Sequence, residues 1–132
     1  MKGLTSCITK TLTTGTLMVC SDNSGAKMIY IISALRYKGT RGRGPQLGIG
    51  DVIIGSVRKG KPDMIKKVVK ALIIRQKKEF RRANGTRIGF EDNAVVLVSD
   101  DFLPIGTEIK GVVAREIAER FPKVAAISAG VV

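Results

Sequence analysis

The residues of this sequence best suited to chemistry are arginines and lysines concentrated in one part of the chain. Residues 36–82 hold 15 basic and 3 acidic residues and so carry a net charge of +12, equal to that of the whole 132-residue chain. Residues 1–35 contribute +2 and residues 83–132 contribute −2. Such a regional excess of positive charge predicts one basic face, formed by loops and a hairpin, of the kind that binds nucleic acid. A solvated basic surface without a dedicated partner is the alternative, although charge of one sign repels itself.

We expect the phosphate contacts to come from the basic residues in and beside this segment. The candidates are Arg36, Lys38, Arg41, Arg43, Arg58, Lys59, Lys61, Lys66, Lys67, Arg75, Lys77, Lys78, Arg81, Arg82 and Arg87. Stacking of single-stranded bases needs exposed aromatic rings, and only Tyr37 and Phe80 lie among basic residues. Contacts to phosphates are therefore expected to outweigh readout of bases. Folded RNA, whose phosphates approach from several directions, fits best; DNA stays open, although no helix–turn–helix pattern is visible.

Catalytic and metal-binding chemistry finds little support in the residue types. There is no histidine, the side chain whose ordinary pKa lies closest to neutral pH. Asp100 and Asp101 are adjacent, but no third ligand lies near them, and a solvated turn explains the pair. Cys7 and Cys20 form neither a Cys-x-x-Cys pair nor a disulfide framework, which is typical of a cytosolic protein. We therefore predict a protein that is not an enzyme and has no cofactor and no metal site.

A glycine-rich loop, Gly39–Gly50, carries Arg41 and Arg43. It is not a P-loop, because the single Gly-Lys pair of the chain, Gly60-Lys61, is followed by proline. It is not a dinucleotide fingerprint, because Pro45 and more loop follow where a helix would begin. Glycines let the backbone lie close to phosphates while the arginines contact them, so we interpret the loop as part of a phosphate-binding surface. An ordinary surface loop is the alternative.

The chain is organised around residues 71–98, which have the pattern of a long hairpin. Two apolar segments, Ala71–Ile74 and Ala94–Val98, flank a basic stretch, Arg75–Arg82, that holds five Lys/Arg against one Glu. The dipeptide Asn84-Gly85 follows, and it is typical of hairpin turns because it tolerates positive φ. A buried base with a cationic tip would hold positive charge away from a rigid core.

Three further runs rich in β-branched residues predict strands at Thr16–Cys20, Ala26–Tyr37 and Asp51–Val57. Asp63–Lys67 is expected to form a short helical turn. Val113–Phe121 has apolar residues at four-residue spacing and predicts an amphipathic helix that ends at Pro122. Lys123–Ser128 is expected to return to a strand. About five short strands and one terminal helix predict a mainly β protein, a small barrel that forms one domain over residues 1–132.

The sequence shows no targeting or membrane pattern. Lys10 interrupts the apolar residues that follow Lys2, so no signal-peptide core forms. No run approaches the roughly 20 apolar residues that span a bilayer. We therefore expect a soluble, cytoplasmic protein.

The hairpin stretch resembles the signature of the universal large-subunit ribosomal protein L-fourteen family. That signature has a small residue with three aliphatic residues, Asn or Asp with Gly, an aromatic residue, and Asn before a Val-aliphatic pair. Its counterparts here are Ala71-Leu72-Ile73-Ile74, Asn84-Gly85, Phe90, Asn93 and Val96-Leu97. Further matches extend the resemblance over nearly the whole chain, at Asp22-Asn23-Ser24-Gly25-Ala26, Gly50-Asp51, Arg81-Arg82 and Gly111–Arg115-Glu116. The length and the segment Arg120-Phe121-Pro122-Lys123-Val124 resemble archaeal and eukaryotic members.

The resemblance implies a closed five-stranded β-barrel with a projecting β-ribbon and one or more short C-terminal helices. It implies a structural constituent of the large ribosomal subunit that binds rRNA and lies at the intersubunit interface in the cytoplasmic ribosome. There it would help to form a bridge to small-subunit rRNA and would contact neighbouring ribosomal proteins. Residues 113–124 would dock the anti-association initiation factor six. The residues assigned to this protein contact are Arg115, Glu116, Glu119, Arg120, Phe121 and Lys123.

Two other functions stay open at this point. One is a free-standing barrel of the OB type that binds single-stranded RNA or DNA. The other is a protein-interaction barrel whose charge serves only solubility. Co-sedimentation with large ribosomal subunits through a high-salt wash would support a ribosomal protein and contradict both alternatives.

Overall fold

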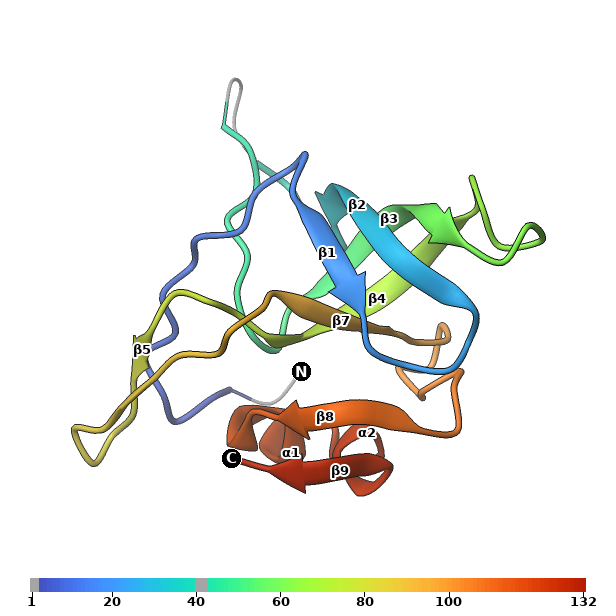
Figure 1. Ribbon diagram of the computed structural model, residues 1–132. Helices are drawn as coiled ribbons and strands as arrows, with labels where there is room; N and C mark the ends of the chain where they lie inside the picture. The colour runs from blue at the N-terminus through green and yellow to red at the C-terminus, as the bar shows by residue number, and fades with distance from the viewer. Residues whose placement is uncertain (1–2, 40–42) are drawn as a thin grey trace.

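The computed structural model describes residues 3–39 and 43–132, and its centre is a closed barrel of five strands (Figure 1). The strands follow one another around the barrel as β1 (Leu17–Cys20), β2 (Ala26–Ala34), β3 (Val52–Gly60), β4 (Val68–Arg75) and β7 (Ala94–Leu97). Neighbouring strands pair antiparallel except β1 and β7, whose parallel pairing closes the barrel. The expected mainly β class and five-stranded barrel are confirmed.

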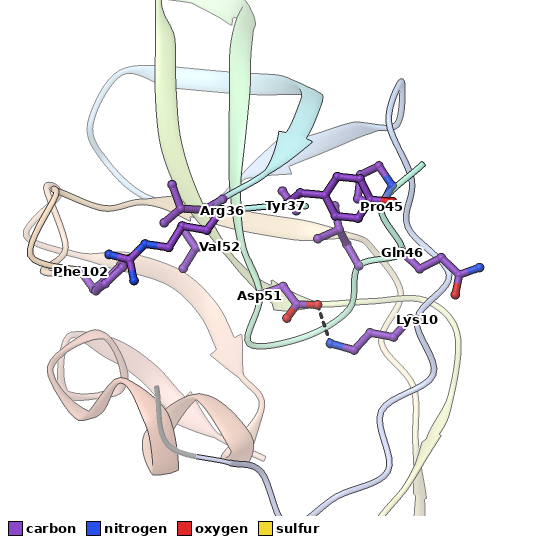
Figure 2. Close-up of a pocket in the computed structure, with 11 residues that line it drawn as sticks. Lys10, Arg36, Tyr37, Pro45, Gln46, Asp51, Val52 and Phe102 are labelled. Atoms are coloured by element: carbon purple, nitrogen blue, oxygen red, sulfur yellow. Dashed lines mark hydrogen bonds and ion pairs between the residues drawn. The ribbon is translucent and has the colours of Figure 1, made fainter. Parts of the chain in front are cut away.

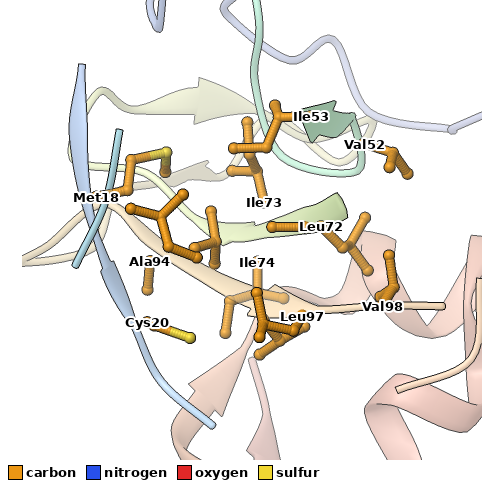
Figure 3. Packing of buried hydrophobic residues seen from close by; sticks show 14 of the residues in the cluster. Met18, Cys20, Val52, Ile53, Leu72, Ile73, Ile74, Ala94, Leu97 and Val98 are labelled. Carbon is orange, nitrogen blue, oxygen red and sulfur yellow. The ribbon is translucent and has the colours of Figure 1, made fainter. Parts of the chain in front are cut away.

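Aliphatic side chains fill the barrel. Figure 3 shows Met18 of β1, Ile53 of β3 and Ile73 of β4 gathered in one cluster, and each is fully buried. Residues 71–75 of β4 and 94–97 of β7 are buried at every position, so both faces of these two strands are covered. Burial of each large aliphatic side chain contributes about 1.5–3 kcal/mol. The base of the predicted hairpin is therefore the most deeply buried part of the sheet.

The C-terminal segment forms a second layer against the barrel. It consists of β8 (Ile109–Val113), α1 (Arg115–Arg120), α2 (Pro122–Ala126) and β9 (Ser128–Val131), with β8 and β9 paired in parallel (Figure 1). The predicted helix is present as α1, but the strand expected at Lys123–Ser128 is wrong. A second helix begins at Pro122 instead, because proline at the first helical position lacks only an N–H that would have no helical partner.

A ribbon projects from the barrel between β4 and β7. It consists of β5 (Phe80–Arg81) and β6 (Arg87–Ile88), joined by a tight turn (Figure 1). Gly85 has a φ of 87°, and its N–H donates to the Arg82 carbonyl at 2.9 Å. The hairpin turn predicted from Asn84-Gly85 is confirmed.

Residues 3–15 make two isolated bridges, Cys7 to Arg81 and Leu12 to Leu47. The helical turn expected at Asp63–Lys67 is present only in part: the N–H groups of Met64 and Ile65 donate to the Lys61 carbonyl at 2.9 and 3.2 Å, and the segment then closes the β3–β4 hairpin. The Lys66 N–H donates to the Val57 carbonyl at 2.9 Å, and Lys66 has a φ of 69° that a right-handed helix does not allow. Neither described helix is long and apolar enough to cross a lipid bilayer.

Candidate nucleic-acid interface

The structure exposes twelve of the fifteen predicted phosphate-binding residues. They lie on three cationic projections: the loop after β2 (Arg36, Lys38, Arg43), the β3–β4 turn with its flanks (Arg58, Lys59, Lys61, Lys66, Lys67) and the ribbon (Lys77, Lys78, Arg81, Arg87). Figure 1 places these projections at three separate corners of the molecule. Arg41 lies outside the described residues. The expectation of a single basic face is therefore wrong, because the fold divides the basic segment into three clusters that point in different directions.

Carboxylates of the same chain leave most of this charge unneutralised. Among residues 3–39 and 43–132 the structure has five ion pairs, formed by Lys10, Lys70, Arg75, Arg82 and Arg87. Only Arg87 belongs to the exposed set, and its Nη1 lies 3.6 Å from Glu79 Oε1. Arg58 packs on the Tyr30 ring, with its guanidinium carbon 4.5 Å from the ring centroid. The three projections therefore present positive charge to solvent.

Arg75 is placed differently from the expectation, because its guanidinium is buried between the barrel and β8. Nε and Nη2 donate to the Asp92 carboxylate, at 2.9 and 3.2 Å. Nη1 donates to the carbonyls of Lys110 and Val112, and Nη2 donates to Ser21 Oγ at 2.7 Å. Because its guanidinium N–H groups are taken up by these acceptors, Arg75 joins β4 to the C-terminal layer. It is therefore not part of the nucleic-acid interface.

Arg82 is likewise buried, with 8% of its surface exposed, and it joins the ribbon to the C-terminal layer. Its Nε donates to Glu116 Oε1 at 2.9 Å, and its Nη2 donates to the Val132 carbonyl at 2.5 Å. Ser6 Oγ also donates to Glu116 Oε1, at 2.6 Å. Burial by itself raises the pKa of Glu116, but the hydrogen bonds from Arg82 and Ser6 outweigh it and hold the pKa below its usual value. Arg82 is therefore a structural residue rather than a phosphate ligand.

The residues assigned to protein contact divide in the same way. Arg115 and Lys123 are exposed, whereas Glu116 and Phe121 are buried and do not present a contact surface. The half-buried Glu119 accepts a hydrogen bond from Thr5 Oγ1 at 3.0 Å. Arg120, also half-buried, donates from Nη1 to the Gly50 carbonyl at 3.1 Å. The helix predicted to face a partner is thus mainly anchored to its own chain.

Phe121 also takes part in a small apolar site next to α2. Its ring packs at 60° to that of Phe102, with centroids 6.1 Å apart. The two rings line a cavity of about 290 Å³ together with Leu103, Pro122 and Lys123. An exposed lysine beside an apolar hollow is a surface that a protein partner can use.

Sequence reasoning missed Gln76, a fully buried residue that fixes the base of the ribbon. Its Nε2 donates to the carbonyls of Thr9 and Lys78, both at 3.0 Å, and its Oε1 accepts from the Ile49 N–H at 3.1 Å. Phe80 is also fully buried, although it was expected to lie among exposed cations. An uncharged amide inside a basic run, directly after a buried strand, is the signal that could have pointed to Gln76.

The cysteines and carboxylates show no sign of chemistry within the described part of the chain. Burial, reinforced by the neighbouring Asp22 carboxylate, raises the pKa of the Cys20 thiol to about 12. Cys7 is exposed, and both cysteines are free. No three His, Cys, Asp or Glu side chains of residues 3–39 and 43–132 gather into a group that could hold a metal ion. Asp100 lies in an exposed turn, where the hydrogen bond from Lys70 lowers its pKa.

The closed barrel, the anchored ribbon and the exposed cations define a small β-barrel protein with the charge distribution of a nucleic-acid-binding protein. Residues 11–132 match the family model for ribosomal protein L14p/L23e, and the chain belongs to this family. It is 53% identical over 128 residues to the large ribosomal subunit protein uL14 of Methanocorpusculum labreanum, with 97% of each chain covered. It is 49% identical over 132 residues to the uL14 protein of Methanothrix thermoacetophila, with 100% of each chain covered. The family predicted from the sequence is confirmed, and these relatives are archaeal.

Proposed function

We propose that this protein is a structural constituent of the large ribosomal subunit, in the cytoplasmic ribosome, that binds rRNA through its three cationic projections. Its family and the names of its archaeal relatives support the ribosomal assignment. The observation that carries the binding mechanism is the set of twelve exposed cations, of which one has a carboxylate partner among the described residues. In this mechanism the chain is not an enzyme and uses no cofactor.

The geometry explains how such binding would work. The buried contacts of Gln76 and Arg82 hold the ribbon against the rest of the chain, so its lysines project from a fixed base. The loop after β2 and the β3–β4 turn project from the same barrel at other corners (Figure 1). Folded RNA surrounds a bound protein with phosphates from several sides, whereas a lone extended strand would reach only one projection. Three separated clusters therefore favour folded RNA over the single-strand binding of an OB-type barrel.

We further infer that the protein lies at the intersubunit interface, where it helps to form a bridge to small-subunit rRNA and contacts neighbouring ribosomal proteins. The family resemblance supports this location. The C-terminal layer supports a protein-binding role, since residues 83–132 carry a net charge of −2 and offer exposed Lys123 beside the apolar cavity at Phe121. Arg115 is also exposed on this layer. This surface is the proposed docking site for the anti-association initiation factor six. The buried Glu116 is not part of it.

Reconstitution with ribosomal subunits tests the proposed function. The tagged chain is mixed with salt-stripped large subunits from a methanogenic archaeon and sedimented through a high-salt cushion, with small subunits as the control. We expect the protein to sediment with large subunits alone. Recovery in the supernatant at every salt concentration would contradict the proposal and would favour a free-standing binding module.

The salt dependence of rRNA binding tests the mechanism separately. The logarithm of the affinity should fall linearly with the logarithm of the salt concentration, by roughly 0.7–0.9 for each neutralised phosphate. A steep slope is expected from the three projections. A flat slope would contradict the electrostatic mechanism even if the protein proved to be ribosomal.

A further inference from the structure

A cavity of about 300 Å³ opens at the foot of the loop after β2. Leu35, Leu47 and Val52 give it apolar walls, and Arg36, Tyr37 and the Lys10–Asp51 ion pair give it polar and aromatic ones. In Figure 2 the Tyr37 ring lies beside Pro45 at one end, and the Arg36 side chain extends toward Phe102 at the other. The volume lies at the small end of ligand pockets, which suits a single flat ring system.

Tyr37 is held in place although 40% of its surface is exposed. Its hydroxyl donates to the Arg43 carbonyl at 2.9 Å, which fixes the tip of the ring. The backbone of Gly39 lies so close to the ring that a Cβ at this position would collide with it. A fixed, exposed aromatic ring among cations is the platform on which proteins stack unpaired bases.

Arg36 has a φ of 58°, a left-handed backbone conformation that residues other than glycine rarely adopt. The chain turns here directly after β2, with the Tyr37 N–H donating to the Ala34 carbonyl at 3.4 Å. Strain of this kind concentrates at binding sites, where the side-chain direction matters. In Figure 2 this turn directs the Arg36 guanidinium along the cavity.

The Lys10–Asp51 pair has spare hydrogen-bonding groups at the cavity. Lys10 Nζ lies 2.5 Å from Asp51 Oδ2, which also accepts the Gly48 N–H at 2.9 Å. Both hydrogen bonds that the structure gives this carboxylate end on Oδ2, so Oδ1 can still accept a hydrogen bond. An ammonium has three donors, so Lys10 also keeps donors for a ligand.

We propose that this cavity binds one unstacked nucleobase of RNA and that it prefers guanine. The Watson–Crick edge of guanine places the O6 acceptor beside the N1–H and N2–H donors. Lys10 donates to O6 while Asp51 Oδ1 accepts from the N–H groups, and the base stacks on Tyr37. Arg36 contacts N7 or the adjoining phosphate. The inference rests on the proposed rRNA binding and adds base recognition to an interface otherwise made of phosphate contacts.

Three variants, each with a different expected outcome, test the site. The probe is full-length large-subunit rRNA of a methanogenic archaeon. Tyr37→Leu removes the ring and should weaken binding roughly tenfold with an unchanged salt slope, as expected when stacking is removed. Tyr37→Phe keeps the ring but loses the bond to Arg43, and its affinity should stay within about twofold of the wild type. Lys38→Gln, in the same loop, should lower the salt slope by roughly 0.7–0.9.

These variants separate the possible failures. Affinity of Tyr37→Leu equal to the wild type, with a steep wild-type salt slope, would overturn the base site and leave the proposed function intact. Equal losses of rRNA affinity in Tyr37→Leu and Tyr37→Phe would also overturn the base site, because Tyr37 would then act only by holding the loop through its hydroxyl. A wild-type protein that binds no rRNA would overturn both proposals.

Cross-linking identifies the base and its source. The complex is irradiated at a wavelength that RNA bases absorb, digested with nuclease and protease, and analysed by mass spectrometry. A guanosine adduct on the peptide that contains Tyr37 supports the proposal, and an adduct of another base at Tyr37 overturns the preference. Free guanosine and adenosine monophosphates are titrated in parallel by NMR. Binding of free nucleotide, with rRNA affinity insensitive to Tyr37→Leu, would identify a soluble nucleotide as the ligand and overturn the RNA assignment.

Discussion

Arg81 and Arg82 are adjacent residues with opposite surroundings. Arg81 is exposed on the ribbon, whereas Arg82 is buried and donates to Glu116 and to the Val132 carbonyl. Arg82→Ala would leave the Glu116 charge buried without its partner, which costs about 3–5 kcal/mol. Arg81→Ala should change the free energy of unfolding by less than about 0.5 kcal/mol. Urea denaturation of the two variants measures this difference.

The affinity for rRNA should show the reverse order. When both variants are folded, Arg81→Ala should weaken rRNA binding more than Arg82→Ala does. Arg81→Ala removes one phosphate contact and should lower the salt slope of binding by roughly 0.7–0.9. For the unfolding measurements, an equally small loss of unfolding free energy in Arg81→Ala and Arg82→Ala would show that the buried Arg82–Glu116 pair does not hold the ribbon in solution.

Glu116 gives the unfolding free energy a predictable pH dependence. Its pKa in the folded chain lies below the ordinary value of 4.5, so the stability that the ionised carboxylate contributes is complete above that value. This contribution is lost as the pH falls through the folded pKa. Glu116→Gln should be less stable than the wild type at pH 7, and the gap should narrow from pH 5 to pH 3. Urea denaturation across this range checks it, and a gap independent of pH would contradict the assignment.

The buried roles of Arg75 and Arg82 were beyond prediction from the sequence. Both residues lie in a run of exposed cations, and the groups that receive their hydrogen bonds come largely from residues 110–132, far along the chain. A local pattern carries no information about such distant carbonyls. The exposed cations at Lys61 and Lys66 were easier, because turns lie at the surface of almost any fold.

At the scale of elements, the ribbon turn depends on one backbone conformation. Gly85 has a φ of 87°, and among the described residues, its chain neighbours aside, no atom lies within 4 Å of the position of a Cβ either there or at Gly44. Gly85→Ala should therefore cost about 1–2 kcal/mol through the left-handed backbone alone. Gly44→Ala, the matched control without a positive φ, should be neutral or stabilising by about 0.4–1 kcal/mol. Thermal unfolding of both variants tests this, and equal effects would show that the turn relaxes freely.

Strands were the most predictable elements, because long runs of β-branched residues such as Ala26–Ala34 have few other ways to fold. The C-terminal layer was less predictable. Proline at position 122 is compatible both with the end of one helix and with the start of another, and only packing against the barrel decides between them. The pairing of β9 with β8 is set by the same packing, since the sequence Ser128–Val131 has no strong pattern of its own.

At the scale of the whole molecule, the three cationic projections make a joint prediction about binding. One variant replaces Lys59, Lys61, Lys66 and Lys67 with Gln, and another replaces Lys77, Lys78 and Arg81. If folded rRNA contacts the projections at the same time, each variant should lower the salt slope, by roughly 0.7–0.9 for each phosphate that is no longer neutralised. The decreases in log affinity should add in the combined variant. A decrease confined to one variant would show that a single projection carries the binding.

We also propose that residues 1–132 unfold as one unit. Arg75 and Arg82 connect the barrel and the ribbon to the C-terminal layer through hydrogen bonds that are buried or partly buried, so neither layer is complete without the other. Tryptophan is absent, so near-ultraviolet circular dichroism of the tyrosines and far-ultraviolet circular dichroism provide the two probes. Coincident urea transitions are expected. Two separated transitions would instead contradict unfolding as one unit.

The parallel pairing of β1 with β7 also determines when a newly synthesised chain can complete its folding. Val19 and Ala94 are register partners, so the barrel cannot close until most of the polypeptide has been translated. Until then one edge of β1 stays unpaired, and an open edge of this kind invites association with other strands. Closure through such distant partners is intrinsically slow. A nascent chain arrested before residue 94 would therefore have an open sheet that is prone to aggregation. Early binding of RNA to its cationic loops would reduce that aggregation.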